Sequence, residues 1–403
     1  MSTLLQPTDH WALWAVMIAG TGTAIWLEQT QKWAAKLSGP VVALLIAMTL
    51  SNTGLVPTDA PAYDFVGNWL VPLAIPLLLF RANALQILRT TGRMLICFHI
   101  ATAGTLLGTV LAWLALRHAI GSPDIEHASG MMAGSYIGGS VNFFALKTSY
   151  AVRDTVSNPL IVADNFVMAG IFVALLGIAA SRFFRRHYPH PHSLDADAAG
   201  AENLAAHHWQ RKGISLLDLA KSLAFAFVVV ACADGLGRLS RAAFGDVSHA
   251  GFALQMFQIL ATNRFVLLTG LSLLLATLLH RQLASVNGPE DLGAYLLYLF
   301  LFVTGLPADL KAVLFNAPLF FVFCGIIAVT NLGFTLGVGK LCGLPLEELL
   351  LSVNATLGGA PSAAAMATSC GWTRLILPGI LVAIWGYVIG TPIGVLVVEL
   401  FKR

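Results

Sequence analysis

Two glycine pairs interrupt apolar stretches of the sequence and have small polar side chains beside them. They belong to the segments GSYIGGSVNFFAL at 134–146 and NATLGGAPSAAAM at 354–366. A glycine inside a helix costs about 1 kcal/mol and a proline such as Pro361 about 3 kcal/mol, so both segments predict broken helices. A broken helix frees backbone N–H and C=O groups, with which secondary transporters bind solutes and ions. We therefore predict a solute-binding site at the two breaks, formed by Ser135, Tyr136, Gly138, Gly139, Ser140, Asn142, Asn354, Thr356, Gly358, Gly359 and Ser362.

An internal repeat supports this interpretation over the alternative, which is close packing of helices through small residues. Shifting the sequence on itself by 220 positions (354 minus 134) superposes the two glycine pairs without a gap. At a second offset of 226 positions (307 minus 81), RANALQIL at 81–88 aligns with PADLKAVL at 307–314. The duplication predicts a matching pair of broken helices. The identities at offset 220 are Gly138/Gly358, Gly139/Gly359, Ala145/Ala365, Thr148/Thr368, Ser149/Ser369, Val162/Val382, Ala163/Ala383, Gly170/Gly390 and Leu176/Leu396.

One apolar run carries an acid and an amide side by side. Asp164 and Asn165 lie in VADNFVMAG, where the second copy of the repeat has Ile384 and Trp385. A carboxylate inside the bilayer is costly and marks an ion or proton pathway by default. We therefore predict that Asp164 and Asn165, with Asn331 at mid-depth on a later span, couple transport to Na⁺ or H⁺. The alternative is a buried pair that only makes structural hydrogen bonds.

The composition shows what surrounds these residues. Of 403 residues only 20 are Asp or Glu and 23 are Lys or Arg, 57% are hydrophobic, and the mean hydropathy is +0.78. Such a chain would expose too much apolar surface in water, so we expect an all-α membrane protein whose partner is the lipid bilayer. The net charge of +3 is too weak to indicate nucleic acid. We also expect no enzyme activity, no cofactor and no metal site, because catalytic motifs and closely spaced cysteines are missing.

Apolar runs of about 20 residues, long enough to cross the hydrocarbon layer, recur along most of the chain. A polar linker, 182–213, separates a first transmembrane repeat, 1–181, from a second, 214–403. A weaker run at 243–262 is either a thirteenth span or a surface helix. The twelve clear spans are predicted at 11–27, 37–55, 65–80, 94–117, 127–148, 157–181, 214–236, 264–280, 290–306, 317–339, 346–368 and 374–399.

Charges in the short loops indicate sidedness. Basic residues follow the first, third and fifth spans, and acidic residues follow the second and fourth, which predicts an external N-terminus. On this assignment Asp124 and Glu126 lie outside, whereas Lys147 and Arg153 lie inside. The linker histidines could bind a metal, but we expect a solvated linker without one. They are His187, His190, His192, His207 and His208.

The segments GSYIGGSVNFFAL, LGGAPSAAAMA and PADLKAVL resemble the bacterial membrane family called domain of unknown function 819 (YjcL-like), and the resemblance covers nearly the whole chain. That family is similar to the superfamily of sodium/proton antiporters and bile-acid sodium symporters. The resemblance implies two inverted repeats with a crossing pair of broken helices, in the bacterial cytoplasmic (inner) membrane. Inversion needs an odd number of steps between the broken spans, so we expect 243–262 to be a thirteenth span.

The same resemblance implies that Asp164 and Asn165 stand where antiporters carry an Asp-Asp or Asn-Asp pair that binds the cation. Electrogenic antiporters also have a lysine on the span before the second broken helix. This chain has Asn331 there, and Lys340 only at the end of the span. We therefore expect a secondary transporter that moves a small organic, preferably anionic, solute with Na⁺ or H⁺. The alternative is a monovalent cation/proton antiporter. The sequence leaves the solute and the oligomeric state open, a homodimer included.

Overall fold

The structure, a computed structural model, describes residues 3–31, 34, 39–192, 213–244, 252–307 and 310–403. In this part of the chain all regular secondary structure is helical, as the composition predicts. Among the described residues, six helices are long and apolar enough to cross a membrane, or seven if the bent pair α14 and α15 is counted as one span. The protein is thus an all-α membrane protein, and each of the twelve predicted spans coincides with at least one helix.

The first half of the chain runs from α1 to α11. Its long helices are continuous, whereas the predicted third span is divided into α4, the π-helical η1 and α5, and the predicted fifth span into α8 and α9. The bounds are α1 His10–Thr30, α3 Gly39–Asn52, α4 Pro61–Phe65, η1 Val66–Leu70, α5 Val71–Leu78, α6 Ala84–Thr90, α7 Arg93–Ile120, α8 Asp124–Gly138, α9 Ser140–Ser149, α10 Asp154–Ala180 and α11 Arg182–His187.

The second half follows the linker, most of which lies outside the described residues. It contains α13 Leu216–Phe244, α14 Phe252–Thr262, α15 Arg264–Leu278, α16 His280–Leu283, α17 Pro289–Gly305, α18 Leu310–Leu341, α19 Leu346–Ser369, η3 Thr373–Leu375 and α20 Ile376–Phe401.

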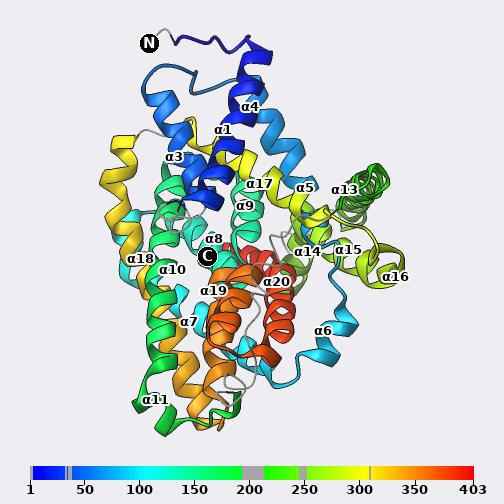
Figure 1. Cartoon of the computed structure of the whole chain (residues 1–403). Helices are drawn as coiled ribbons and strands as arrows, with labels where there is room; N and C mark the ends of the chain where they lie inside the picture. The colour runs from blue at the N-terminus through cyan, green and yellow to red at the C-terminus, as the bar shows by residue number, and fades with distance from the viewer. Residues whose placement is uncertain (1–2, 32–33, 35–38, 193–212, 245–251, 308–309) are drawn as a thin grey trace.

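The helices form two bundles (Figure 1). In the core bundle, α7, α8, α9, α10, α18, α19 and α20 pack mainly on one another. In the flanking bundle, α1, α3, α5, α13, α15 and α17 do the same, and fewer contacts join the two bundles. Figure 1 shows α1, α3, α5 and α17 in the upper part of the view, with α7, α19 and α20 below them. Both bundles draw helices from both halves of the chain, so neither half is a separate domain.

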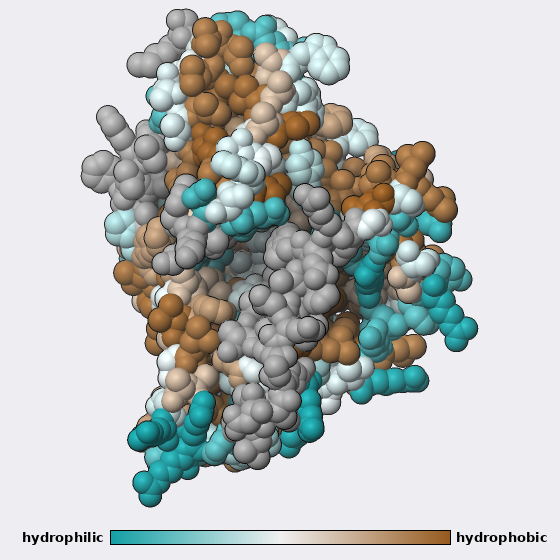
Figure 2. Space-filling model, in the orientation of Figure 1, coloured by the Kyte–Doolittle hydropathy of each residue, from teal (hydrophilic) through white to brown (hydrophobic). Residues whose placement is uncertain are grey.

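The outer surface suits a lipid environment. Figure 2 shows broad apolar areas over the flanks of the molecule, and polar residues gathered at its lower tip and right-hand edge. Large apolar side chains that are exposed on long helices include Trp26, Val173 and Leu239. In water this distribution would be unfavourable, but lipid tails cover such surfaces at no cost.

Helices α7 and α18 cross closely at the centre of the core bundle. A methyl group at Gly104 would lie 3.0 Å from the Asn331 Cα atom, and one at Gly108 would lie 2.8 Å from the Ile327 Cα atom. Glycine is therefore needed at both positions of α7. Gly104 thus lies against Asn331 and Gly108 against Ile327, so the residue numbers increase along α7 while they decrease along α18. The two helices therefore run antiparallel.

The segment expected as a thirteenth span does not form a helix that could cross alone. Residues 245–251 lie outside the described part, and α14 has only 11 residues. Such a helix rises about 16 Å, roughly half of the hydrocarbon thickness. It is bent by 71° against α15, and the two helices together are long and apolar enough to cross a membrane. The structure therefore corrects the expectation of a separate thirteenth span: α14 and α15 form one bent unit.

Candidate functional site

Both predicted helix breaks are present. Gly139 separates α8 from α9 with φ 73° and ψ −179°, and Gly359 interrupts α19 with φ 74° and ψ −171°. Positive φ is readily available only to glycine. The two positions that superpose at offset 220 thus share one unusual backbone conformation, which confirms the prediction of a paired break.

At the first break the chain folds back on itself. Leu146 lies against Gly134, although twelve residues of continuous helix would separate the two by about 18 Å. Gly394 of α20 contacts both Leu146 and the Gly130 carbonyl, so α9 returns beside α8. We call residues 124–149 hairpin 1 and Gly138–Ser140 its tip.

The second break folds back in the same register. The Ser362 hydroxyl donates a hydrogen bond of 2.8 Å to Asn354 Oδ1 across the two arms, and Gly379 contacts both Leu351 and Ala363. The pair Asn354 and Ser362 lies 220 positions after the pair Gly134 and Asn142, which are neighbours in hairpin 1. We call residues 346–369 hairpin 2 and Gly358–Ala360 its tip.

These contacts correct the expectation of two broken helices that each cross the membrane. In both segments the second arm returns toward the end of the bundle from which the first arm came. Arg153, which follows hairpin 1, donates a hydrogen bond of 2.5 Å to Asp124 at its start, and Lys147 at its end pairs with Asp154. The prediction that Asp124 and Arg153 lie on opposite sides of the membrane is therefore wrong. The loop charges misled it because the fifth predicted span does not cross.

The two hairpins enter the core bundle from opposite ends of α20. At the base of hairpin 1, the Tyr150 hydroxyl donates a hydrogen bond of 3.0 Å to Glu399, near the end of α20. At the base of hairpin 2, Leu351 packs on Gly379, near the start of α20. The intervening 20 residues of helix (399 minus 379) rise about 30 Å. The two tips therefore meet near the middle of α20.

Tyr387 of α20 lies between the two tips. A methyl group at Gly139 would be 3.2 Å from the Tyr387 ring, and one at Gly359 would be 3.1 Å from its hydroxyl oxygen. The Ala360 N–H donates to this oxygen at 3.4 Å. The predicted proximity of the two breaks is thus confirmed, and one partly buried side chain touches both. Sequence reasoning missed Tyr387, because a single aromatic residue on an apolar helix gives no signal of its own.

A ladder of glycines holds hairpin 1 on α20. Added methyl groups at Gly130, Gly134 and Gly138 would meet the backbone carbonyls of three α20 glycines. Both helices thus place glycines four residues apart on one face, which allows backbones to approach closely. This spacing is visible in the sequence and could have predicted the contact. The carbonyls belong, in the same order, to Gly394, Gly390 and Gly386.

Asp164 lies beside hairpin 1, buried to 8% exposure. The Ser135 hydroxyl donates to its Oδ2 atom at 3.3 Å, and its Oδ1 atom has no hydrogen-bond partner. The Tyr136 hydroxyl also neighbours this carboxylate, but without hydrogen-bond geometry. Ser135 and Tyr136, predicted for the solute site, therefore lie beside Asp164, predicted for ion coupling. Asn165, by contrast, donates to Ile161 on its own helix.

Asn331 connects the two hairpins instead of joining Asp164. Its amide donates 2.7 Å to Thr105, whose hydroxyl donates 3.0 Å to the Tyr136 carbonyl of hairpin 1. The same amide donates 3.3 Å to Thr356 of hairpin 2, and its Oδ1 atom accepts from Thr335. The Asn331 amide group is thus used to join the supports of the two hairpins.

Both polar atoms of the Asn142 side chain are also hydrogen-bonded. Its amide nitrogen donates 2.7 Å to the Gly138 carbonyl, and its Oδ1 atom accepts a 2.6 Å hydrogen bond from Thr391. Both bonds fasten the tip of hairpin 1 to itself and to α20. Ser140, which follows the break, is exposed, while Ser362 is partly buried. The other predicted tip residue, Gly358, contacts Met168 of α10.

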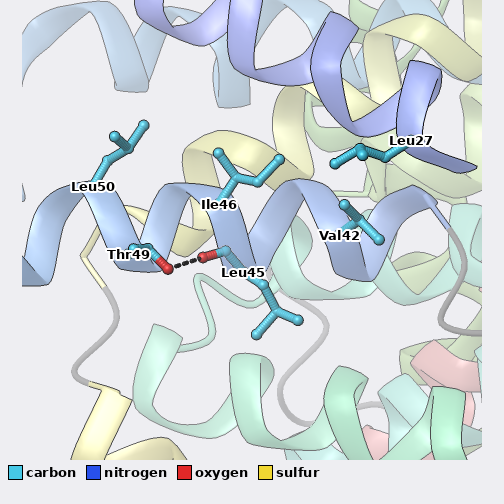
Figure 3. Close-up of a pocket in the computed structure, with 6 residues that line it drawn as sticks. All are labelled: Leu27, Val42, Leu45, Ile46, Thr49 and Leu50. Carbon is cyan, nitrogen blue, oxygen red and sulfur yellow. Dashed lines mark hydrogen bonds between the residues drawn. The ribbon is translucent and has the colours of Figure 1, made fainter. Parts of the chain in front are cut away.

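An open pocket elsewhere does not offer comparable chemistry. It has a volume of about 270 Å³ between α1 and α3, and Figure 3 shows that five of its six labelled residues are Leu, Ile or Val. The one hydroxyl, of Thr49, donates 2.8 Å to the Leu45 carbonyl within α3. Such a pocket suits acyl chains better than a polar solute.

The described end of the linker packs on hairpin 2. Leu346 donates a hydrogen bond of 2.8 Å to the Pro189 carbonyl, and His192 contacts Glu347 and Glu348. This part of the linker is therefore ordered against the core, which differs from a fully solvated linker. His207 and His208 lie outside the described residues.

The fold and the site define a helical membrane protein in which two glycine-tipped hairpins meet beside a buried carboxylate. The family model described as "Protein of unknown function (DUF819)" matches residues 15–403. The chain is also 40% identical over 395 residues to the "Uncharacterized membrane protein YjcL" of Bacillus subtilis (strain 168), covering 98% of this chain and 97% of that protein. The chain belongs to the DUF819 family, as its glycine segments and the PADLKAVL turn predict.

Proposed function

We propose that the protein is a secondary active transporter that moves a small organic solute across the bacterial cytoplasmic membrane, driven by Na⁺ or H⁺. The observation that carries this proposal is the meeting of both hairpin tips on Tyr387, together with the incompletely hydrogen-bonded carboxylate of Asp164 on Ser135, about one helical turn before the tip of hairpin 1. Non-helical backbone within a membrane is tolerated only where it is buried in protein or lines a site. Two such tips at one place serve a ligand better than they serve packing.

We propose further that the halves are inverted repeats. The antiparallel crossing of α7 and α18, and hairpins that enter from opposite ends of α20, support this relation. We count each hairpin as a segment that does not cross, and α14 with α15 as one crossing. Each half of the chain then crosses the membrane an odd number of times, so inversion needs no thirteenth span. Inverted repeats let a transporter expose one central site to either side by moving one bundle against the other.

Asp164 is the proposed coupling residue. An ionised carboxylate buried with one hydrogen bond of 3.3 Å is poorly compensated. A bound proton or monovalent cation would compensate the negative charge of the carboxylate. After its release the buried charge would be unfavourable until another proton or cation binds. Met168, one helical turn after Asp164 on α10, contacts the tip of hairpin 2 at Gly358. Through α10, ion occupancy at hairpin 1 can therefore influence the solute site at hairpin 2.

A monovalent cation/proton antiporter is the competing function. It would need Asp164 but would leave without a role the amide nitrogen of Asn354 in hairpin 2, which has no hydrogen-bond partner. The engaged Asn331 amide, at the place where electrogenic antiporters carry a lysine, also disfavours it.

Proteoliposomes loaded from a metabolite pool distinguish the two functions. Gradient-driven accumulation of a solute under an imposed Na⁺ or H⁺ gradient supports the symporter. Cation/proton exchange without solute accumulation supports the antiporter. Empty liposomes provide the control, and absence of both fluxes would reject transport by this protein alone.

A further inference from the structure

The two hairpins share a backbone but differ in which polar groups are free. In hairpin 1, both polar atoms of Asn142 are bonded within the protein. In hairpin 2, only the Oδ1 atom of Asn354 is bonded, to Ser362. The Nδ2 atom of Asn354 has no partner, although the residue is 0% exposed. Leaving a buried donor unpaired is energetically unfavourable, so a ligand that accepts a hydrogen bond from this amide would restore the missing interaction.

Tyr387 supplies a second donor at the same tip. Its hydroxyl oxygen accepts from the Ala360 N–H, and no acceptor for its own proton is found among the described residues. The Ala360 N–H opens the returning arm of hairpin 2, where the helix dipole favours negative charge. The Asn354 amide, the Tyr387 hydroxyl and the N-terminus of the returning arm thus all lie at, or within about one helical turn of, the tip of hairpin 2.

We infer that hairpin 2 binds the acidic group of the solute, a carboxylate, through Asn354 Nδ2 and Tyr387 Oη, whereas hairpin 1 serves as a fixed support. This inference rests on the proposed transport function and adds to it the class of solute and the residues that select it. Carboxylates accept hydrogen bonds only, which matches a group of unpaired donors. The corresponding neutral amides present donors of their own and fit less well.

The roles differ in a way that substitutions can separate. Tyr387→Phe keeps the ring between the tips and removes only the hydroxyl. Asn354→Asp keeps an acceptor for Ser362 but replaces the free donor with an acceptor that repels an anion. Tyr150→Phe is the matched control, because it removes a hydroxyl that bonds Glu399 at the base of hairpin 1.

The experiment measures the thermal unfolding midpoint of the purified full chain with sodium acetate, succinate, glutamate or citrate. Sodium chloride at equal ionic strength, acetamide and succinamide serve as comparisons. A ligand that binds only the folded state raises the midpoint with concentration. We expect at least one acid to stabilise the protein more than its amide. We also expect Tyr387→Phe and Asn354→Asp each to weaken the apparent affinity for that acid by about tenfold. Tyr150→Phe should leave that affinity unchanged.

Three results would overturn the inference. They are stabilisation by none of the four acids, stabilisation by the amides equal to that by the acids, and an acid effect that survives both Tyr387→Phe and Asn354→Asp. If Asn354→Asp fails to fold, Tyr387→Phe alone decides between retained and weakened binding. The pool uptake assay judges the transport function separately, because a neutral solute that accumulates would uphold transport and reject only the carboxylate.

Discussion

Asp164 is the residue on which energy coupling would depend. It is buried, and one of its carboxylate oxygens has no partner. Asp164→Asn keeps the shape and the hydrogen bond from Ser135 but removes the charge that binds a proton or cation. We expect gradient-driven accumulation to be lost while the protein still folds, as measured by uptake of the solute found in the pool assay and by the unfolding midpoint. Asp64→Asn, at an exposed position on α4, is the control. Undiminished gradient-driven uptake by Asp164→Asn would remove Asp164 from the mechanism.

For Asn331 we expect a structural role. Because its amide reaches Thr105 and Thr356, it joins the supports of both hairpins. Asn331→Leu leaves these hydroxyls with fewer partners, and we expect it to lower the free energy of unfolding by about 1–3 kcal/mol. Thr109→Val is the control, since the Thr109 hydroxyl only bonds the Thr105 carbonyl one turn earlier in α7. Thermal unfolding in detergent measures both variants. Loss of ion dependence in Asn331→Leu without loss of stability would instead place Asn331 in the coupling site.

The individual residues of the site could be predicted only in part. The glycine pairs could be found because two adjacent glycines weaken a helix and the pair recurs at the same place in the repeat. Asp164 could be found because a buried acid is costly. Tyr387 and the free amide of Asn354 depend on which helices become neighbours in the folded chain. No local property of the sequence separates Asn354 from Asn142, although only Asn354 keeps an unpaired nitrogen.

At the scale of helices, the glycine ladder between α8 and α20 is the contact that fixes hairpin 1. A methyl group at Gly390 would lie 2.8 Å from the Gly134 carbonyl oxygen. We therefore expect Gly390→Ala to destabilise the protein by about 1–3 kcal/mol through overpacking. Gly170→Ala is the matched control, because a methyl group there meets nothing within 4 Å, and removing a helix glycine can stabilise by about 0.5–1 kcal/mol. Equal unfolding midpoints for the two variants would show that the glycine ladder between α8 and α20 does not contribute to the stability of the protein.

This pair also shows the limit of the repeat. Gly170 and Gly390 are identical at offset 220 in the sequence, yet only Gly390 packs against another backbone. The breaks at Gly139 and Gly359 were predictable because one residue decides them locally. The direction in which the chain continues was not, because it is set by docking on α20. For this reason spans that look continuous in hydropathy fold as hairpins.

At the scale of the whole molecule, transport by the proposed mechanism requires the core bundle to move against the flanking bundle. One contact between them joins Ser149, at the end of α9, to Asn263, between α14 and α15. The Asn263 side chain donates to the Ser149 hydroxyl at 2.7 Å. Tyr150 and Glu399, whose side chains are 3.0 Å apart, both belong to the core bundle. The two pairs are close in space and differ in whether motion between the bundles would separate them.

We therefore expect a cross-link between cysteines at 149 and 263 to stop gradient-driven uptake, and a cross-link between cysteines at 150 and 399 to leave it running. The same short bifunctional thiol reagent is used for both pairs, and a cleavable spacer lets a reductant restore uptake in the first. Gel mobility measures the extent of cross-linking. Uptake that continues at full cross-linking of 149 to 263 would show that α9 does not move relative to α14 and α15, and would exclude transport by displacement of these two bundles. The background variant replaces the free cysteines Cys97, Cys232, Cys324, Cys342 and Cys370.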